Sequence, residues 1–545
     1  MTRSKSQLVS RCTLCPAGCQ IRVVRSGPDT WQADPPEKTE LGLCPRGSCL
    51  GELLGHRLRI RFPARRVDGK LQPCSQADAA RAILAAAGQG PILLLLDGNS
   101  PCEDLAAAAA WCNAWEQAQL CLVVEPADRQ LLLGTEASGA DYLSAEELSQ
   151  CDGFVIVGDA FAANPTCSRG LLDRRRSQPR TPIVVIDPAA GVASKFATHS
   201  VDCRPGMELS ALQAVAAGAG VQIEAEPARP PTEMPSALAA GKALSQCKRL
   251  AVLVSAEHGR SVAWQQRGET AGRLAKALGG GVAVQTVGAN ALAAVRLEGN
   301  LQTMPLAEAL SGAHAVRVAV GCDVLGMLGT DEPSILAAAA PLPNRTTEAA
   351  QVVLPVAMPG ELGGTFLFDG GQAARIDPLM AAPAGVPSPA ELIAALARAA
   401  GVAATVPAEA DAAALERLSP RKPATPPPPP EANGPLLLLG KHAMHSGCGS
   451  LTAAASWQAS VQSAPELRMA APDAGGMGLE NLSWVTVRSG DRSVRARLRI
   501  APELPDGVLV LSDGFPQSRA MIPCRIDAEA GAVAAEPVTV TVSAD

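Results

Sequence analysis

Apolar runs alternate with Ala-rich helical patterns through the middle of the chain. A first pass contains strand patterns at 91–96, 120–125, 154–157 and 183–187, with helical patterns at 103–119 and 168–176. After a Pro-rich break at 225–236, a second pass contains strand patterns at 250–254, 282–286, 316–320 and 352–354, with a helical pattern at 263–278. Short apolar strands that alternate with helices are typical of βαβ units and parallel sheets. We therefore predict an α/β fold with two doubly wound lobes, at 61–235 and 236–400.

The pattern changes on either side of these lobes. Residues 1–60 are rich in Cys and basic residues, whereas the segment 401–434 contains five consecutive prolines. Consecutive prolines favour an extended polyproline conformation, so this segment is predicted to be a linker. Beyond it, strand patterns at 484–488, 494–500, 507–511 and 538–542 are separated by Gly and Asp turns. They predict a β-barrel-like domain at 435–545.

Composition narrows the classes of function. In the 545-residue chain, 53 acidic residues outnumber 47 basic ones, which argues against a basic nucleic-acid surface. The chain holds only 6 Trp, 1 Tyr and 7 Phe, so aromatic platforms for stacking bases are scarce as well. Its apolar runs are too short to cross a bilayer, and the N-terminus lacks the apolar core of a signal peptide. We expect a cytoplasmic protein that does not insert into membranes, in which clustered Cys point to metal or redox chemistry.

The strongest chemical signal is the spacing of four cysteines near the N-terminus. Cys12, Cys15 and Cys19 form a C-x2-C-x3-C motif, and Cys44 follows after 24 residues. Three closely spaced thiolates with a distant fourth are typical of the ligands of an iron–sulfur cluster. Structural zinc is the alternative, but zinc sites usually pair two short C-x2-C hairpins, and the spacing from Cys44 to Cys49 fits that pattern poorly. We predict a [4Fe–4S] cluster domain at 1–60, with these four thiolates as its ligands.

A cation follows the fourth of these cysteines. Arg46 stands two residues after Cys44. A positive charge beside a reduced cluster would offset the negative charge of the cluster and raise its potential. An ordinary solvated arginine is the other interpretation of this position.

These motifs resemble the opening of the iron–sulfur and molybdopterin oxidoreductase superfamily. That superfamily includes formate dehydrogenases, periplasmic-type nitrate reductases, formylmethanofuran dehydrogenases and the large iron–sulfur subunit of NADH:quinone oxidoreductase. Further segments resemble the superfamily in the same order along the chain, at 57–69, 151–158, 164–165, 186–188, 201–206, 347–366 and 465–479. The resemblance therefore covers nearly the whole chain.

The resemblance implies a bis(molybdopterin guanine dinucleotide) cofactor that carries Mo or W. Gly158 follows a predicted strand, where backbone N–H groups can hold a pyrophosphate. Asn164 and Asp187 lie in segments that look like the first nucleotide-binding half, and His442 lies where the family places a loop facing the pterin. The weak candidate for a protein ligand of the metal, and hence for a catalytic residue, is Cys102.

The chain also departs from the family pattern. The loop after the strand that ends at 157 reads Gly-Asp-Ala-Phe rather than the family's Gly-x-Asn-Pro, and no Cys-His pair typical of formate dehydrogenases is present. These departures match best the large NADH:quinone oxidoreductase subunit, here without its ferredoxin-like domain. The resemblance then implies an iron–sulfur electron-transfer subunit whose partners are other redox subunits of a complex. One alternative is a Mo or W enzyme acting on formate or a formyl C1 group; another is a structural scaffold without cofactor.

Overall fold

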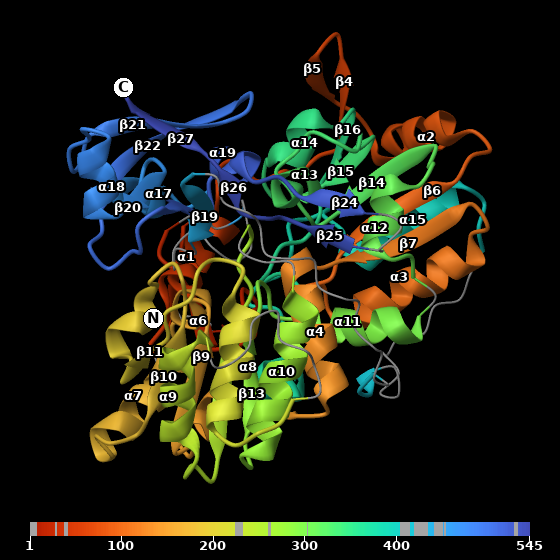
Figure 1. Ribbon diagram of the computed structural model, residues 1–545. Helices are drawn as coiled ribbons and strands as arrows, with labels where there is room; N and C mark the ends of the chain where they lie inside the picture. The colour runs from red at the N-terminus through yellow and green to blue at the C-terminus, as the bar shows by residue number, and fades with distance from the viewer. Residues whose placement is uncertain are drawn as a thin grey trace.

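The computed structural model describes residues 8–27, 30–36, 42–223, 233–259, 263–301, 303–403, 415–418, 434–440, 451, 454–527 and 532–545. Figure 1 shows a small N-terminal domain, two α/β lobes and a C-terminal β-rich domain that contacts both lobes.

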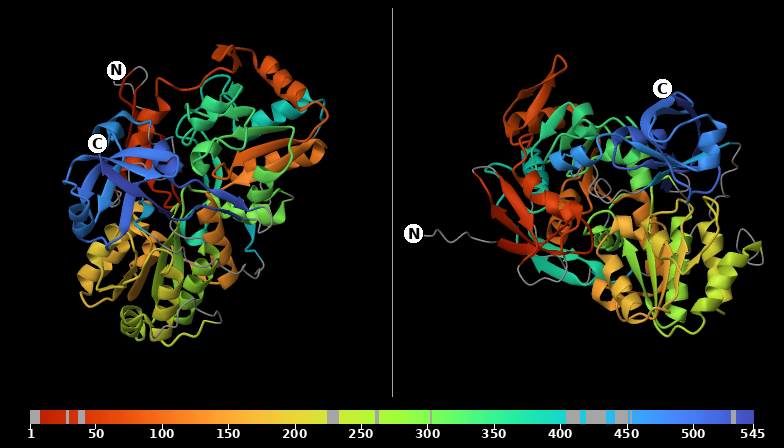
Figure 2. Two further views of the ribbon diagram at one scale, coloured as in Figure 1. Left: turned by 45° about the horizontal axis from the view of Figure 1, so that its top comes forward. Right: turned by 90° about the vertical axis from the view of Figure 1, so that its left-hand side faces the viewer.

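The N-terminal domain is a three-stranded antiparallel sheet with one helix. Strands β1 (Leu8–Arg11), β2 (Gln20–Arg25) and β3 (Trp31–Asp34) pair in that order, and helix α1 (Pro45–Leu54) packs on the sheet. Gly51 permits this packing, since a Cβ atom there would lie 2.7 Å from the carbonyl oxygen of Trp31. In the right-hand view of Figure 2, this domain lies against one side of both lobes.

One lobe is built from two separate parts of the chain, and we call it the split lobe. Its sheet has the order β5-β4-β16-β15-β14-β6-β7. These strands are β4 (Ala64–Val67), β5 (Lys70–Pro73), β6 (Ile92–Asp97), β7 (Ala118–Val123), β14 (Val316–Val320), β15 (Ala337–Ala339) and β16 (Val352–Leu354). Helices α2 (Gln76–Ala87), α3 (Cys102–Ala114) and α15 (Pro389–Ala399) cover one face, and α12 (Leu306–Ser311) and α13 (Val324–Leu328) cover the other. The run of buried Leu in β6 is apolar on both faces because both faces are covered.

The other lobe, here the inserted lobe, has a six-stranded, entirely parallel sheet of order β11-β10-β9-β12-β13-β8. Its strands are β8 (Asp141–Tyr142), β9 (Gly153–Val157), β10 (Ile183–Ile186), β11 (His199–Ser200), β12 (Leu250–Ser255) and β13 (Gly281–Gln285). Helices α8 (Glu208–Gly218), α9 (Pro235–Leu244) and α10 (Trp264–Ala277) pack on one face. Helices α5 (Ala145–Leu148) and α7 (Cys167–Ser177) pack on the other, so the lobe is doubly wound.

The predicted division at 235/236 is wrong, because the sheets combine strands from both predicted lobes. Strands β6 and β7 were expected in the first lobe, yet β6 pairs with β14 of the expected second lobe. Conversely, β12 was expected to open the second lobe and pairs with β9 of the first. Local patterns identify strands but do not encode which parallel strands become neighbours, and here all of 141–285 is inserted between the two halves of one sheet.

Two element boundaries also differ from the predictions. The helix predicted at 103–119 ends at Ala114, because the backbone turns extended at Trp115 and enters β7 at residue 118. The strand predicted at 538–542 is two strands, β26 (Val538–Thr539) and β27 (Thr541–Ala544).

The C-terminal domain is a curled seven-stranded sheet of order β26-β19-β23-β20-β22-β21-β27. Its other strands are β19 (Leu436–Gly440), β20 (Glu466–Met469), β21 (Trp484–Ser489), β22 (Arg492–Ile500) and β23 (Val508–Ser512). The edge strands β26 and β27 are separated by Val540 alone, so the two edges of the sheet must approach each other and the sheet forms a half-barrel. A hairpin of β24 (Arg525–Asp527) and β25 (Ala532–Ala534) reaches across to α12 of the split lobe (Figure 1).

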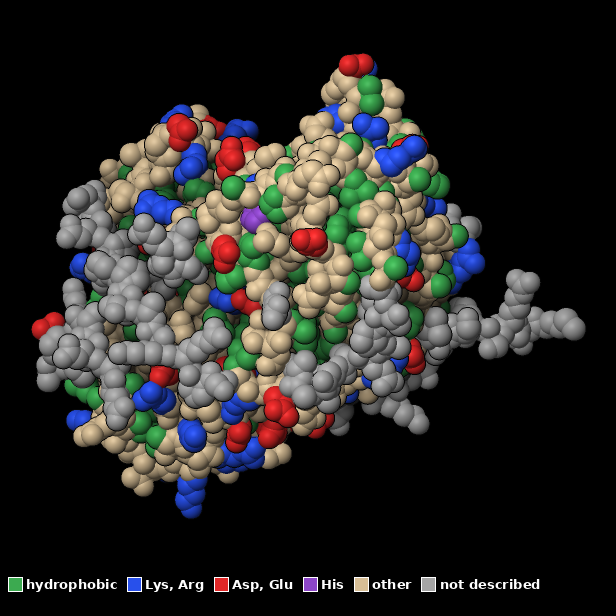
Figure 3. All heavy atoms as spheres, turned by 90° about the vertical axis from the view of Figure 1, so that its right-hand side faces the viewer, with side chains coloured by type: hydrophobic (Ala, Val, Ile, Leu, Met, Phe, Trp, Pro, Cys, Tyr) green, Lys and Arg blue, Asp and Glu red, His purple; other side chains and the backbone are tan. Residues whose placement is uncertain are grey.

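Figure 3 shows acidic, basic and apolar side chains interspersed over one face of the molecule. Among the described residues, no helix combines the length and the apolar character needed to cross a membrane.

Candidate functional site

The four predicted cluster ligands come together in the N-terminal domain. Cys12, Cys15 and Cys19 lie on the loop that joins β1 to β2, which is closed by a 2.8 Å hydrogen bond from the Cys12 N–H to the Cys19 carbonyl. Cys44 is the N-cap of α1, and its sulfur accepts a hydrogen bond from the Gly47 N–H at 3.5 Å. A thiolate at a helix N-terminus is stabilised by the helix dipole and by the free N–H groups there.

Burial controls the protonation of these thiols in the absence of a metal. Burial raises the pKa of Cys12 well above its ordinary value, and the neighbouring thiols Cys15, Cys44 and Cys19 raise it further. Burial likewise raises the pKa of Cys15, and it raises that of Cys19 to about 11. Each of Cys12, Cys15 and Cys19 thus responds to neighbouring thiols of the set; Cys12 and Cys15 are buried, whereas Cys19 and Cys44 are half-buried. Such thiols ionise readily only when a cation takes the place of the protons.

The loop that carries the thiols is held by a hairpin of the split lobe. Gly18 has φ +55°, and a Cβ atom there would lie 2.5 Å from the ring of Phe368. Phe368 lies between β17 (Gly364–Leu367) and β18 (Ala373–Ile376), and its ring stacks on Phe366. The close contact seals this side of the Cys loop from water.

Arg46 is buried, with 1% of its surface exposed, rather than solvated. Its guanidinium lowers the pKa of Cys15 against the larger effect of burial, so the charge lies close to that thiol. The same group donates a hydrogen bond to the carbonyl oxygen of Ala163, the last residue of the short helix α6 (Ala160–Ala163) after β9. Arg46 therefore connects the start of α1 to the end of α6 in the inserted lobe.

Asn164, also a predicted cofactor residue, takes part in the same junction. Its amide nitrogen donates to Asp369 at 3.2 Å, and its amide oxygen accepts from the Thr166 hydroxyl at 2.7 Å. Burial raises the pKa of Asp369 to about 7 in spite of this bond. The side chain of Asn164 is thus engaged in linking the inserted lobe to the segment that follows β17.

Within the described residues, no three His, Cys, Asp or Glu side chains converge closely enough to hold a single metal ion.

The turn after β9 is the predicted pyrophosphate site. Gly158 has φ +79°, and its N–H donates to the Ile186 carbonyl at 3.0 Å. The next N–H, that of Asp159, donates to the Glu257 carboxylate at 2.9 Å. Asp187 follows β10, and its carboxylate accepts from the N–H groups of Ala189 at 3.0 Å and Gly191 at 2.7 Å. These loops satisfy their own backbone donors with carboxylates of the chain, so the residues present do not fit a pyrophosphate here.

A cavity of about 230 Å³ lies at the carboxyl ends of β6, β7 and β14, under the C-terminal domain. Its charged lining residues are Asp97, Glu125, Asp323, Asp513 and Arg519. Burial raises the pKa of the Asp97 carboxyl to about 6. The position matches the rule that open α/β sheets bind ligands outside the carboxyl ends of their strands.

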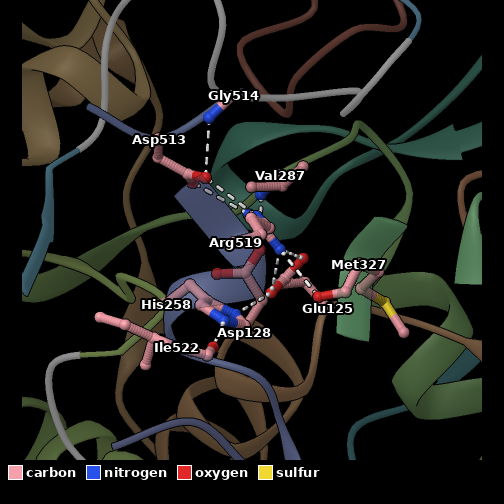
Figure 4. A network of polar contacts seen from close by, with 9 residues as sticks. All are labelled: Glu125, Asp128, His258, Val287, Met327, Asp513, Gly514, Arg519 and Ile522. Atoms are coloured by element: carbon pink, nitrogen blue, oxygen red, sulfur yellow. Dashed lines mark hydrogen bonds and ion pairs between the residues drawn. The ribbon is translucent and has the colours of Figure 1, made fainter. Parts of the chain in front are cut away.

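The Arg519 guanidinium is the centre of an ionic network beside this cavity (Figure 4). It contacts Asp513 at 2.9 Å and Glu125 at 3.1 Å, and Glu125 also lies 3.5 Å from the His258 ring. The other ring nitrogen of His258 is 2.7 Å from the Ile522 carbonyl. Glu125 follows β7, His258 follows β12, and Arg519 belongs to the C-terminal domain, so one network joins three parts of the molecule.

The predicted catalytic candidate Cys102 is not brought to these places. Cys102 is fully buried at the start of α3, and its sulfur lies 3.6 Å from the amide nitrogen of Asn290 rather than in the lining of the cavity. Burial raises the pKa of Cys102 to about 11. His442 lies outside the described residues.

One recurring feature was missed at the sequence level: an aspartate at or just after five strand ends. Each accepts a nearby backbone N–H, in a loop or at the start of the next helix: Asp97 from Asn99, Asp159 from Ala162, Asp187 from Gly191, Asp323 from Gly326 and Asp513 from Gly514. An Asp within three residues of each apolar run is the signal that could have identified them.

Comparisons with known proteins agree with this architecture. No protein-family model matches the chain. Nitrate reductase of Klebsiella oxytoca is 27% identical over 230 residues, covering 38% of this chain and 26% of that protein, so the chain matches only about a quarter of its length. The structure of acetylene hydratase from Pelobacter acetylenicus covers 98% of this chain and 100% of its own, with a TM-score of 0.66 at 11% identity. The first is a partial likeness in sequence, and the second shows a fold shared with acetylene hydratase.

Proposed function

We propose that this chain is an iron–sulfur electron-transfer subunit of a multisubunit redox complex. The observation that carries the proposal is that the closed β1–β2 loop bearing Cys12, Cys15 and Cys19 lies beside Cys44 at the start of α1, with the buried Arg46 near Cys15. The donor set fits a [4Fe–4S] cluster, which takes one thiolate on each iron and so needs ligands that surround a volume rather than a point. When bound, such a cluster supplies a one-electron redox centre.

The residues around the pocket have separate roles. The four thiolates hold the cluster, while the Phe368 ring excludes water from the Gly18 side. The Arg46 guanidinium offsets negative charge next to Cys15 and favours the reduced state. The resemblance to the large NADH:quinone oxidoreductase subunit supports partners that hold further redox centres. All of the cysteines that the structure describes have free thiols, which supports a reducing, cytoplasmic setting.

The test is elemental and spectroscopic analysis of the anaerobically purified full chain. We expect four Fe and four sulfide per chain and an EPR signal after reduction with dithionite. Cys15→Ser should lose Fe and the signal. Cys49→Ser is the matched control, because Cys49 is buried in α1 and its thiol donates to the Arg46 carbonyl at 3.0 Å, a bond that a serine hydroxyl can replace. Zinc instead of Fe, or a Cys15→Ser variant with unchanged Fe, would contradict the proposal.

A second candidate is a Mo or W enzyme acting on formate or a formyl group. It is favoured by the cavity at the carboxyl ends of β6, β7 and β14 and by the fold shared with acetylene hydratase. Stoichiometric Mo or W with pterin in the same sample, together with formate oxidation, would favour this candidate over the relay.

A further inference from the structure

A pyrophosphate on a strand-to-helix turn needs free backbone N–H groups. In the inserted lobe, the turn after β9 offers few backbone N–H groups that could bind a phosphate. The Gly158 N–H is bonded to the Ile186 carbonyl and the Asp159 N–H to Glu257, while the Ala162 N–H donates to the Asp159 carboxylate at 3.3 Å. The short helix that follows is therefore capped from within the chain.

A side chain also fills the space beside this turn. In nucleotide-binding folds, a glycine at this position lets the phosphate approach the backbone closely. Here the open side of Gly158 faces Glu257, and a Cβ atom on Gly158 would lie 2.6 Å and 2.8 Å from the two carboxylate oxygens. The Glu257 side chain is 1% exposed and is held by the Ser255 hydroxyl at 2.5 Å. It is a fixed part of the turn.

The charges around this turn also disfavour a pyrophosphate. Three carboxylates gather at the ends of β9, β10 and β12: those of Asp159, Asp187 and Glu257. Gly191 separates two of them so closely that a Cβ atom there would lie 2.5 Å from the Asp159 carboxylate and 2.6 Å from that of Asp187. A pyrophosphate would add negative charge within this group of carboxylates.

We infer that the Glu257 carboxylate takes the place that a cofactor pyrophosphate would occupy, and that the inserted lobe holds no pterin dinucleotide. The protein then carries at most one such dinucleotide per chain. This inference does not depend on the cluster, since Glu257 and the four thiols lie in different parts of the molecule.

The first test counts nucleotides in the full chain, produced in a host that makes pterin guanine dinucleotides. Acid hydrolysis releases GMP, which mass spectrometry quantifies per chain alongside Fe. We expect no more than one GMP per chain, and two would overturn the inference. The Fe content of the same sample reports on the electron-transfer proposal separately, so the failure of one is distinguished from the failure of the other.

The second test uses GDP as a probe in calorimetric titration. Glu257→Ala removes the carboxylate and should add one GDP site per chain relative to the unaltered protein. Glu257→Gln is the matched control: it keeps the volume and the acceptor for the Asp159 N–H, and we expect it to bind GDP as the unaltered protein does. If Glu257→Ala adds no site, or if Glu257→Gln adds one equally well, Glu257 does not have the role assigned to it.

Discussion

Arg46 is a buried cation placed between two domains, and its charge has a measurable consequence. With the guanidinium next to Cys15, reduction of a bound cluster adds an electron near a positive charge. In Arg46→Gln the midpoint potential should fall by on the order of tens of millivolts, since about 59 mV corresponds to a tenfold change in a one-electron equilibrium. Redox titration followed by EPR measures the shift.

Arg46→Lys is the control for this prediction. It keeps the positive charge but loses the planar fork that reaches the Ala163 carbonyl. Its potential should stay closer to that of the unaltered protein than the potential of Arg46→Gln. Equal shifts in the two variants would mean that the hydrogen bond, and not the charge, sets the potential.

At the residue scale, site residues could be predicted where they lie near one another in the sequence and not where they come from distant segments. The Cys motif and Arg46 are local signals, and the structure brings these residues together. Glu257 could not be predicted, because it meets the Asp159 turn from 98 residues away and nothing near either residue indicates the other. Gly158 was predicted to hold a pyrophosphate; it has the positive φ of a turn glycine, but its open side is filled by that distant side chain.

At the scale of elements, two glycines allow two helices to cross with their backbones in contact. Helix α4 (Pro126–Ser138) packs on α10, and a Cβ atom on Gly134 would lie 1.8 Å from the Gln265 carbonyl oxygen. From the other side, a Cβ atom on Gly268 would lie 2.2 Å from the Leu131 carbonyl oxygen. Neither obstacle is a flexible side chain, so the helices themselves must separate to admit a methyl group.

Gly134→Ala should therefore lower the free energy of unfolding by about 1–3 kcal/mol, the usual range for overpacking. Urea denaturation followed by circular dichroism measures it. The control is Gly475→Ala in α18 (Ala471–Gly476), where a Cβ atom meets nothing within 4 Å and alanine favours the helix. A Gly134→Ala variant as stable as the control would show that the contact between the helices is not tight.

Elements were predicted well where burial is uniform and poorly where their ends or partners matter. The apolar run of β6 identifies the strand because the sheet is covered on both faces. The pattern of α3 does not indicate its end, since no Gly or Pro follows Ala114 and the next residues, Trp115, Glu116 and Gln117, could continue a helix. The order of strands in the two sheets is a tertiary property that no local pattern contains.

At the scale of the whole molecule, Arg519 holds the C-terminal domain against the rest. Arg519→Met would leave the carboxylates of Glu125 and Asp513 buried without their partner, which should cost about 3–5 kcal/mol of unfolding free energy at pH 7. The control is Arg81→Met, since the Arg81 ion pair with Asp78 is exposed to solvent and should contribute little to stability.

The unfolding free energy lost in Arg519→Met should decrease as pH falls. Burial raises the pKa of Asp513, but Arg519 more than offsets this and brings it to about 2, below the ordinary 3.8. The stabilisation is therefore complete above about pH 4 and is lost as pH falls towards 2. In Arg519→Met the buried carboxylate instead prefers its proton, so the stability gap between the two proteins should narrow as pH falls from 5 to 3. Denaturant unfolding at several pH values measures the stability difference between the two proteins. A difference that does not change with pH would show that Asp513 does not contribute to it.

The pairing of β14 with β6 also fixes an order of events during synthesis. Residue 316 of β14 forms its register with residue 92 of β6, and all of 141–285 is made between the two. As the chain emerges from the ribosome, β6 can pair with β7, but its other edge has no partner until the inserted lobe has been released. The residues of the inserted lobe are complete first, while the apolar β6 still lacks β14. We therefore expect the nascent chain to need protection from aggregation at β6 until β14 has been made.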